Sequence, residues 1–166
     1  MFNRTSKTRE PDSFEHAKNY ALFLLNLRLR TEGEMKEKMR ERGYTASVIE
    51  AVITDLQKQN FINDARFAEV FIRSLLEHKN FGFYMIKKKL MEKRLPMPLI
   101  EEQLANLISI ADEHAVAQRY LSKQGLELST DLAYEARQKI AYKLKTRGFR
   151  SDVISKILSG QVPDID

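Results

Sequence analysis

The chain has 166 residues, of which 43% are apolar and 31% are charged, and its net charge is +5. It contains no cysteine, which excludes disulfides, thiolate metal sites and cysteine nucleophiles and is typical of a protein from a reducing cytosol. The longest apolar run, Tyr20–Leu25, is far shorter than the ~20 residues of a membrane span. We therefore expect a cytoplasmic protein without a membrane segment.

A pattern of basic and apolar residues occurs three times, with a period of about fifty residues. The occurrences begin at Lys38-Met39, Lys89-Leu90 and Lys143-Leu144. A fixed period of this length indicates stacked supersecondary units. Their long surface suits an extended partner better than a small-molecule substrate.

The first repeat reads as three short helices. Residues 14–28 carry apolar side chains at helical spacing, and Thr31 opens a second helix with Glu34 placed for a capping box. Gly43 ends this helix, because glycine readily adopts the left-handed conformation found at helix C-termini. Thr45 is predicted to cap the third helix.

The second and third repeats follow the same plan. Asn63-Asp64 opens a helix, and Phe81-Gly82 forms the turn before the next one. The third repeat extends from about Ala111 to Ser159, with Ser129 or Thr130 as the predicted cap of its second helix.

We therefore predict an all-α fold of about nine helices, arranged as three tandem three-helix repeats in an elongated, modular chain. A unit of this size buries little apolar surface alone, so neighbouring repeats are expected to pack together. The predicted segments are a flexible N-terminal tail over residues 1–12, repeats over 13–60, 61–108 and 109–160, and a C-terminal tail over 161–166.

The histidines give no sign of catalysis or of a metal site. His16, His78 and His114 have no second histidine or carboxylate at metal-ligand spacing. The sequence also lacks a phosphate-binding glycine loop and any nucleophile–base arrangement. We therefore expect a protein that is not an enzyme and has no cofactor.

Basic charge is concentrated in two windows at equivalent repeat positions. Residues 79–94 carry six basic side chains and one acid, and residues 137–150 carry six basic side chains and no acid. Such clusters are typical of a protein with a polyanionic partner. In the first repeat, four glutamates between residues 32 and 41 offset the cations, so a polyanion should prefer the second and third repeats.

Basic pairs recur four residues apart on the second helix of each repeat, at Lys38/Arg42, Lys89/Lys93 and Lys143/Arg147. They could form a row of phosphate-binding donors on one helix face. They could equally stabilise the dipole at the helix C-terminus. The aromatic segment 81–84 also has two interpretations, as a surface on which bases stack or as core residues beside a turn.

The order of these motifs resembles the RecX family of bacterial regulatory proteins, which consist of tandem three-helix repeats. The most specific segment, residues 60–68, is similar to the family's Gly-Tyr-Ile/Leu-Asp/Asn-Asp-x-Arg-Phe-Ala sequence. Residues 31–35 resemble its Ser-Glu-x-Glu-Leu, residues 79–86 its Lys-Gly-Tyr-Gly-Pro-x-x-Ile, and residues 147–149 its Arg/Lys-Gly-Phe. The resemblance covers residues 14 to 158.

The chain departs from the family pattern mainly in the second repeat. Asn80 and Phe83 replace the glycine and proline of the turn, and Arg94 replaces the usual glycine. Lys89 stands where glutamate is common, which makes this repeat more basic than the family norm.

The resemblance implies a non-enzymatic regulator of RecA, the recombinase that coats single-stranded DNA as a helical filament. Such proteins inhibit ATP hydrolysis, strand exchange and the co-protease activity that triggers the SOS response, and so modulate DNA repair and recombination. The expected partners are the RecA nucleoprotein filament and single-stranded DNA, bound directly or within the filament, and the chain is expected to be a monomer. The residues that we expect to contact the filament are Lys87, Lys88, Lys89, Lys93, Arg94, Lys143, Lys145, Arg147 and Arg150.

Two alternatives remain open. The chain could be a stand-alone nucleic-acid-binding protein, since three-helix units with basic helices also describe helix-turn-helix modules. It could also be a purely structural helical adaptor, in which case the charge clusters are incidental.

Overall fold

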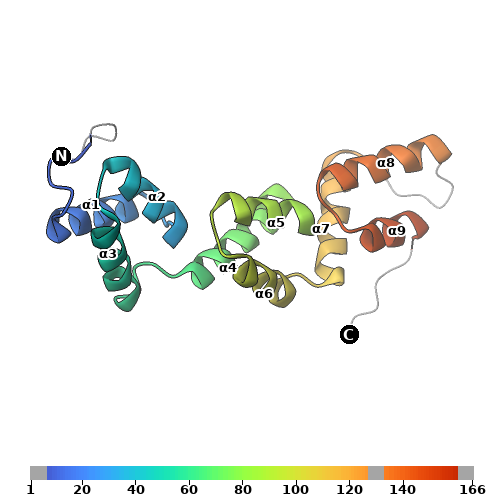
Figure 1. The fold of residues 1–166 in the computed structure, drawn as a ribbon. Coiled ribbons are helices and arrows are strands. Elements are labelled where there is room, and N and C mark those ends of the chain that lie inside the picture. The colour runs from blue at the N-terminus through green and yellow to red at the C-terminus, as the bar shows by residue number, and fades with distance from the viewer. Residues whose placement is uncertain (1–6, 127–132, 161–166) are drawn as a thin grey trace. The chain divides into compact units, whose positions relative to one another are not determined.

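The computed structural model describes residues 7–126 and 133–160. These residues form nine α-helices and one short π-helix, and none of them lies in a β-strand (Figure 1). The helices are α1 (Phe14–Leu27), α2 (Glu32–Arg42), α3 (Ala46–Lys58), α4 (Asp64–Ser74), the π-helix η1 (Leu75–Lys79), α5 (Phe83–Glu92), α6 (Met97–Leu107), α7 (Ile110–Lys123), α8 (Tyr134–Thr146) and α9 (Ser151–Ser159). The predicted all-α fold with three sets of three helices is confirmed.

The chain divides into two compact units. One consists of Met1–Phe67 and Glu92–Pro96, and the other of Ala68–Met91 and Met97–Asp166. The end of α5 therefore belongs to the same unit as α2, whereas the start of α5 belongs to the same unit as α8. Each unit thus contains one junction between successive repeats.

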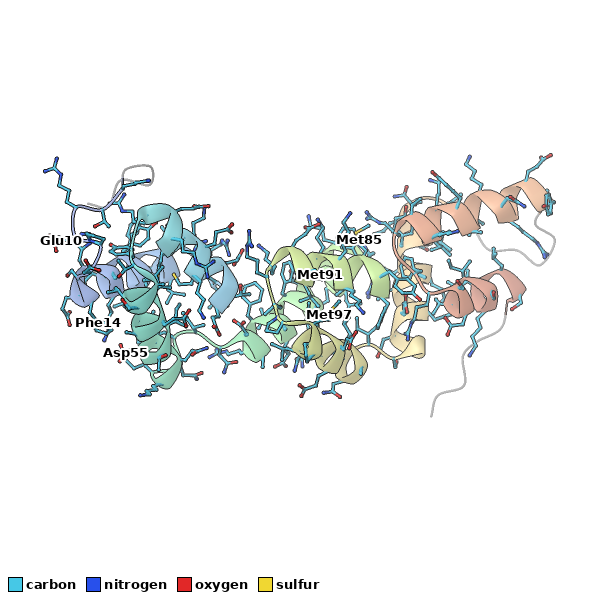
Figure 2. All side chains as sticks on the ribbon, in the orientation of Figure 1. Glu10, Phe14, Asp55, Met85, Met91 and Met97 are labelled. Carbon is cyan, nitrogen blue, oxygen red and sulfur yellow. The ribbon has the colours of Figure 1, made fainter. Side chains whose placement is uncertain are left out.

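The first unit is built around α1, α2 and α3. Met35 and Met39 of α2 are fully buried, as their i, i+4 spacing predicts, and they pack with Tyr20 and Leu24 of α1. Helix α3 contributes the remaining core side chains, which are Ile49, Val52, Ile53 and Leu56. Asp55 of α3, which is labelled in Figure 2, forms an ion pair with Lys18 of α1 at 2.8 Å.

The predicted ends of α2 are confirmed. The Thr31 hydroxyl accepts a hydrogen bond from the backbone of Glu34, and the Glu34 side chain accepts one from the backbone of Thr31, which completes the capping box. Gly43 ends the helix in the left-handed conformation, with φ of +94°. Thr45 is the N-cap residue of α3, but its hydroxyl lies 3.4 Å from the carbonyl of Pro11 and forms no capping bond.

The second unit contains the rest of α4, η1, α5 up to Met91, α6 and the third repeat. One cluster of its buried residues consists of Val116, Ala117, Leu121, Ile140, Leu144, Phe149, Val153 and Ile157. Helix α7 begins with a capping box of Ser109 and Asp112, which the sequence analysis did not predict. The predicted cap at Ser129 or Thr130 lies outside the described residues, and α8 begins at Tyr134 after Ala133.

Candidate partner-binding surface

The end of α8 meets the start of α5 in the second unit. The backbone N–H of Gly82 donates to the carbonyl of Arg147 at 3.1 Å, and that of Tyr84 donates to the carbonyl of Gly148 at 2.8 Å. A Cβ atom on Gly82 would lie only 2.4 Å from the backbone nitrogen of Phe149. The N–H groups at the start of α5 are therefore satisfied by the carbonyls of the two residues that follow α8, rather than by a local cap.

A fully buried carboxylate completes this junction. Glu113 of α7 accepts hydrogen bonds from the backbone N–H groups of Phe83 at 3.0 Å and Arg150 at 2.9 Å. Its second oxygen pairs with the Arg150 guanidinium, which also lies 4.9 Å above the centre of the Phe83 ring. Because Phe83 is the first residue of α5, Glu113 acts as an N-cap supplied from the following repeat.

Arg147 is held by aromatic rings in the same junction. Its guanidinium lies 4.9 Å from the centre of the Phe81 ring and 4.8 Å from that of Tyr120, and it donates to the carbonyl of Lys79 at 2.9 Å. The rings of the aromatic segment 81–84 therefore differ in their surroundings, and stacking on bases stays a prediction. Phe81 pairs with a cation inside the fold, whereas Tyr84 is 58% exposed.

The first unit repeats the same junction at the other end of α5. The Thr31 hydroxyl donates to the carbonyl of Lys93 at 2.5 Å, and the backbone N–H of Glu32 donates to Asp64 at 2.8 Å. Thr31 and Glu32 correspond to Gly82 and Phe83 in the repeat. Asp64 thus caps the start of α2, as Glu113 caps the start of α5. Burial raises the pKa of Asp64, and its hydrogen bond from the Glu32 backbone opposes that effect.

Ion pairs reinforce this first junction. Arg28 contacts both oxygens of Glu34 at 2.9 Å, and Lys93 contacts Glu34 at 3.1 Å. Burial alone would raise the pKa of the Glu34 carboxyl, but the hydrogen bonds from Arg28 and Lys93 outweigh it and hold this pKa below its usual value. Arg94, in the left-handed conformation, pairs with Glu37.

The capping roles of Asp64, which is half-buried, and of the buried Glu113 were not predicted, because the repeats were aligned on their second helices and not on their first. Aligning the first helices reveals the signal. Residues 64–68 and 113–117 share an acid, two variable positions, an aromatic or β-branched residue and an alanine. In the first repeat, Ala17 takes the place of the acid ahead of Tyr20-Ala21.

The nine predicted partner-binding cations fall into two groups. Four of them form the contacts of the junctions, namely Lys93, Arg94, Arg147 and Arg150. The other five lie on the bodies of α5 and α8, namely Lys87, Lys88, Lys89, Lys143 and Lys145. Within this second group Lys87 pairs with Glu101 at 3.1 Å, and Lys89 also has an intramolecular contact. Lys88 and Lys145 are exposed and form no ion pair with another described residue.

The second helices of the repeats differ in charge. Helix α2 carries four acids and four bases, α5 carries one acid and three bases, and α8 carries one acid and four bases. In α2, Lys36 pairs with Glu32 at 2.8 Å and Lys38 pairs with Glu41 at 2.6 Å. The acids of the first repeat therefore offset its cations through direct contacts.

The predicted row of paired cations is wrong for Arg42, the second member of the first pair. Its side chain is buried, and the guanidinium lies 5.3 Å from the centre of the Tyr20 ring. Like Lys93 and Arg147, Arg42 stands at the end of a second helix, and its carbonyl accepts a hydrogen bond from the backbone of Thr8 at 2.7 Å. The basic residue at the C-terminal end of the second helix thus forms an intramolecular contact in every repeat.

Large side chains are exposed on the two basic helices. Tyr84 and Met91 are exposed on α5 (Met91 is marked in Figure 2), and Tyr134 and Tyr142 are exposed on α8. Within the described ranges there is no group of three or more possible metal ligands, and no helix is long and apolar enough to cross a membrane.

Comparison with known proteins identifies the repeats. Residues 17–56 match the family model for the first three-helix domain of RecX, and residues 63–104 match the model for its second three-helix domain. The regulatory protein RecX of Streptococcus sanguinis is 30% identical over 144 residues, which are 87% of this chain and 55% of that protein. The chain therefore spans about half the length of that streptococcal relative. The Clostridium beijerinckii protein of the same name is 28% identical over 90% of this chain and 70% of its own length.

Solved structures agree with these matches. The crystal structure of RecX from Lactobacillus salivarius superposes with a TM-score of 0.78 at 25% identity, over 89% of this chain and 95% of that one. A second structure, of a regulatory protein RecX, has a TM-score of 0.72 at 22% identity and supports the fold. The ordered motifs, the three-helix repeats and these matches agree with one another. The chain belongs to the RecX family of regulatory proteins.

Proposed function

We propose that this protein binds the RecA filament on single-stranded DNA and inhibits its ATPase, strand-exchange and co-protease activities, and so modulates recombination and the SOS response. The observation that carries the proposal is the match to RecX regulatory proteins along most of the chain. A regulator that acts by binding needs a surface complementary to its target. The excess of cations on α5 and α8 is suited to a target that carries phosphates and carboxylates.

The two groups of predicted cations would then have different roles. Lys87, Lys88, Lys89, Lys143 and Lys145 would face the filament. The four junction residues Lys93, Arg94, Arg147 and Arg150 would hold successive repeats at the spacing that such a contact needs. The protein would act as a monomer in the cytoplasm, where its target is found.

The first test is the single-stranded-DNA-dependent ATPase rate of RecA, with this protein titrated from sub-stoichiometric to equimolar amounts. Inhibition well below one molecule per RecA supports action on the filament. No inhibition at equimolar protein, with the DNA still accessible to RecA, would reject the proposal.

Charge reversal locates the surface responsible. Replacing Lys87, Lys88 and Lys89 by glutamate should weaken inhibition more than the same change at Lys36 and Lys38, whose charges are already offset by glutamates. Equal losses in both variants, with helix content intact by circular dichroism, would contradict a dominant role for the later repeats.

A stand-alone nucleic-acid-binding function is the second candidate, and the exposed Lys88 and Lys145 on α5 and α8 favour it. Such a protein would bind bare DNA tightly, with an affinity that falls steeply as salt rises. A filament regulator would bind bare DNA weakly and still inhibit RecA at low ratios. The two functions are therefore separated by their dependence on RecA.

A further inference from the structure

The tyrosines of this chain fall into two classes. There are six in the sequence, of which Tyr20 and Tyr44 are buried and Tyr120 is partly buried against Arg147. The other three are more than half exposed, and they are Tyr84 at 58%, Tyr134 at 75% and Tyr142 at 70%. All three lie on α5 and α8, the two second helices that also carry the excess of lysine.

Helical spacing places lysines beside these rings. On α5, Lys88 follows Tyr84 by four residues, so the two side chains are neighbours on one face. On α8, Lys139 precedes Tyr142 by three residues and Lys145 follows it by three. Lys88, Lys139 and Lys145 are exposed and form no ion pair with another described residue, so their charge is available to a ligand.

The surroundings of Tyr142 argue against a protein-binding hot spot. The residues one turn away are Gln138, Lys139, Lys145 and Thr146, all of them polar and exposed. Protein interfaces are depleted of charged residues around their buried aromatic anchors. An isolated ring with lysines on both sides instead suits a ligand that alternates flat apolar groups with negative charge.

We propose that Tyr84, Tyr134 and Tyr142 stack on the bases of single-stranded DNA while Lys88, Lys139 and Lys145 bind its phosphates. Stacking on aromatic side chains beside a basic track is how proteins bind single strands without reading their sequence. Tyr134 and Tyr142 are eight residues apart on one side of α8, about 12 Å along its axis, so they can engage different bases. The inference rests on the proposed function and deepens it. It states that these helices contact the DNA of the filament rather than carboxylates of RecA.

The test uses the full chain and a fluorescein-labelled oligothymidylate of about 30 nucleotides, without RecA, over about 50 to 200 mM salt. Replacing the three tyrosines by alanine should weaken binding by about fivefold or more for each base that is deprived of its stacking partner, with the salt dependence unchanged. Replacing the three lysines by alanine should lower the slope of log affinity against log salt by about 0.7 for each phosphate that is no longer neutralised.

Two control variants isolate stacking from folding and charge. Phenylalanine at the three tyrosine positions keeps the ring and should keep most of the affinity. Phe61→Ala removes a ring of similar exposure, 51%, outside α5 and α8 and should bind like the wild type. The chain has no tryptophan, so its intrinsic emission comes from tyrosine, and oligothymidylate should quench the emission of the three exposed tyrosines.

The outcomes separate the inference from the proposed function. If the tyrosine-to-alanine variant binds like the wild type, or the wild type does not bind, stacking is rejected. If RecA inhibition persists in either case, the proposed function stands, and α5 and α8 then bind an acidic protein surface. If the variants bind as expected but the wild type leaves RecA unaffected, the proposed function fails and the stacking surface remains.

Discussion

Replacing Glu113 by alanine tests whether a buried carboxylate holds the second and third repeats together. The substitution removes the acceptor of two backbone N–H groups, at 3.0 and 2.9 Å, and the counter-ion of Arg150. Removing one partner of a buried, hydrogen-bonded pair destabilises proteins by about 3–5 kcal/mol. We therefore expect the free energy of unfolding to fall by about 3–5 kcal/mol, a large share of the stability of an ordinary domain.

Urea denaturation followed by far-ultraviolet circular dichroism measures this change. Amide hydrogen exchange at Phe83 and Arg150 adds a local readout, because both N–H groups are deprived of their acceptor and should exchange faster. Glu101→Ala is the matched control. It also removes a glutamate paired with a cation, but its side chain is 61% exposed, so the decrease in stability should stay below about 1 kcal/mol.

Equal effects of the two substitutions, or unchanged exchange at Phe83 and Arg150, would refute the reasoning. If Glu113→Ala does not fold, Glu113→Gln continues the test, because its amide keeps one carbonyl acceptor but lacks the charge that faces Arg150. Exchange at the two amides should then be intermediate between the wild type and an unprotected amide.

Three further predictions follow from the junctions and their neighbours. Gly148→Ala should lower the free energy of unfolding by about 1–3 kcal/mol or more in urea titrations, since φ is +84° and the added Cβ would lie 2.3 Å from the backbone nitrogen of Met85. Asp64→Asn keeps an acceptor for the backbone N–H of Glu32 and should change stability little, whereas Asp64→Ala should lower it by about 1–2 kcal/mol. Burial and the nearby charge of Lys156 lower the pKa of His114, so its contribution to stability is complete above an unfolded pKa of about 6.5 and is lost as the pH falls below that value. His114→Gln should remove this part of the pH dependence in thermal unfolding measured between about pH 5 and 8, and an unaltered profile would contradict the assignment.

Local signals in the sequence predicted much of the fold. The Thr31–Glu34 capping box, the left-handed Gly43 and the buried pair Met35 and Met39 all follow from interactions within a few residues of the chain. Such interactions depend on spacing alone, so a pattern of residue types specifies them. The same reasoning placed three helices in each repeat from their apolar periodicity.

The junctions could not be predicted in the same way, because their partners lie far apart in the chain. Glu113 accepts hydrogen bonds from residues 30 and 37 positions away, and Thr31 donates to Lys93 across 62 positions. Nothing within either segment indicates which acid caps which helix. A carboxylate near the start of a helix is expected to stabilise the dipole of its own helix. Only the tertiary structure reveals the other helix whose backbone N–H groups it caps.

The basic residues of this chain therefore fall into two classes, those with intramolecular contacts and those without, and the sequence alone does not distinguish them. Cations at the ends of the second helices recur because every repeat uses that place: Arg42 and Arg147 stack on rings, and Lys93 pairs with a glutamate. These interactions are intramolecular, and they would be needed whatever the protein binds. Lys88 and Lys145 on the bodies of α5 and α8 have no such use among the described residues, and α2 lacks a comparable excess because its acids pair with its lysines. The lysines that are free to bind a partner are thus the ones that differ between repeats. The basic residues that recur at the helix ends in every repeat instead form intramolecular contacts that stabilise the repeats.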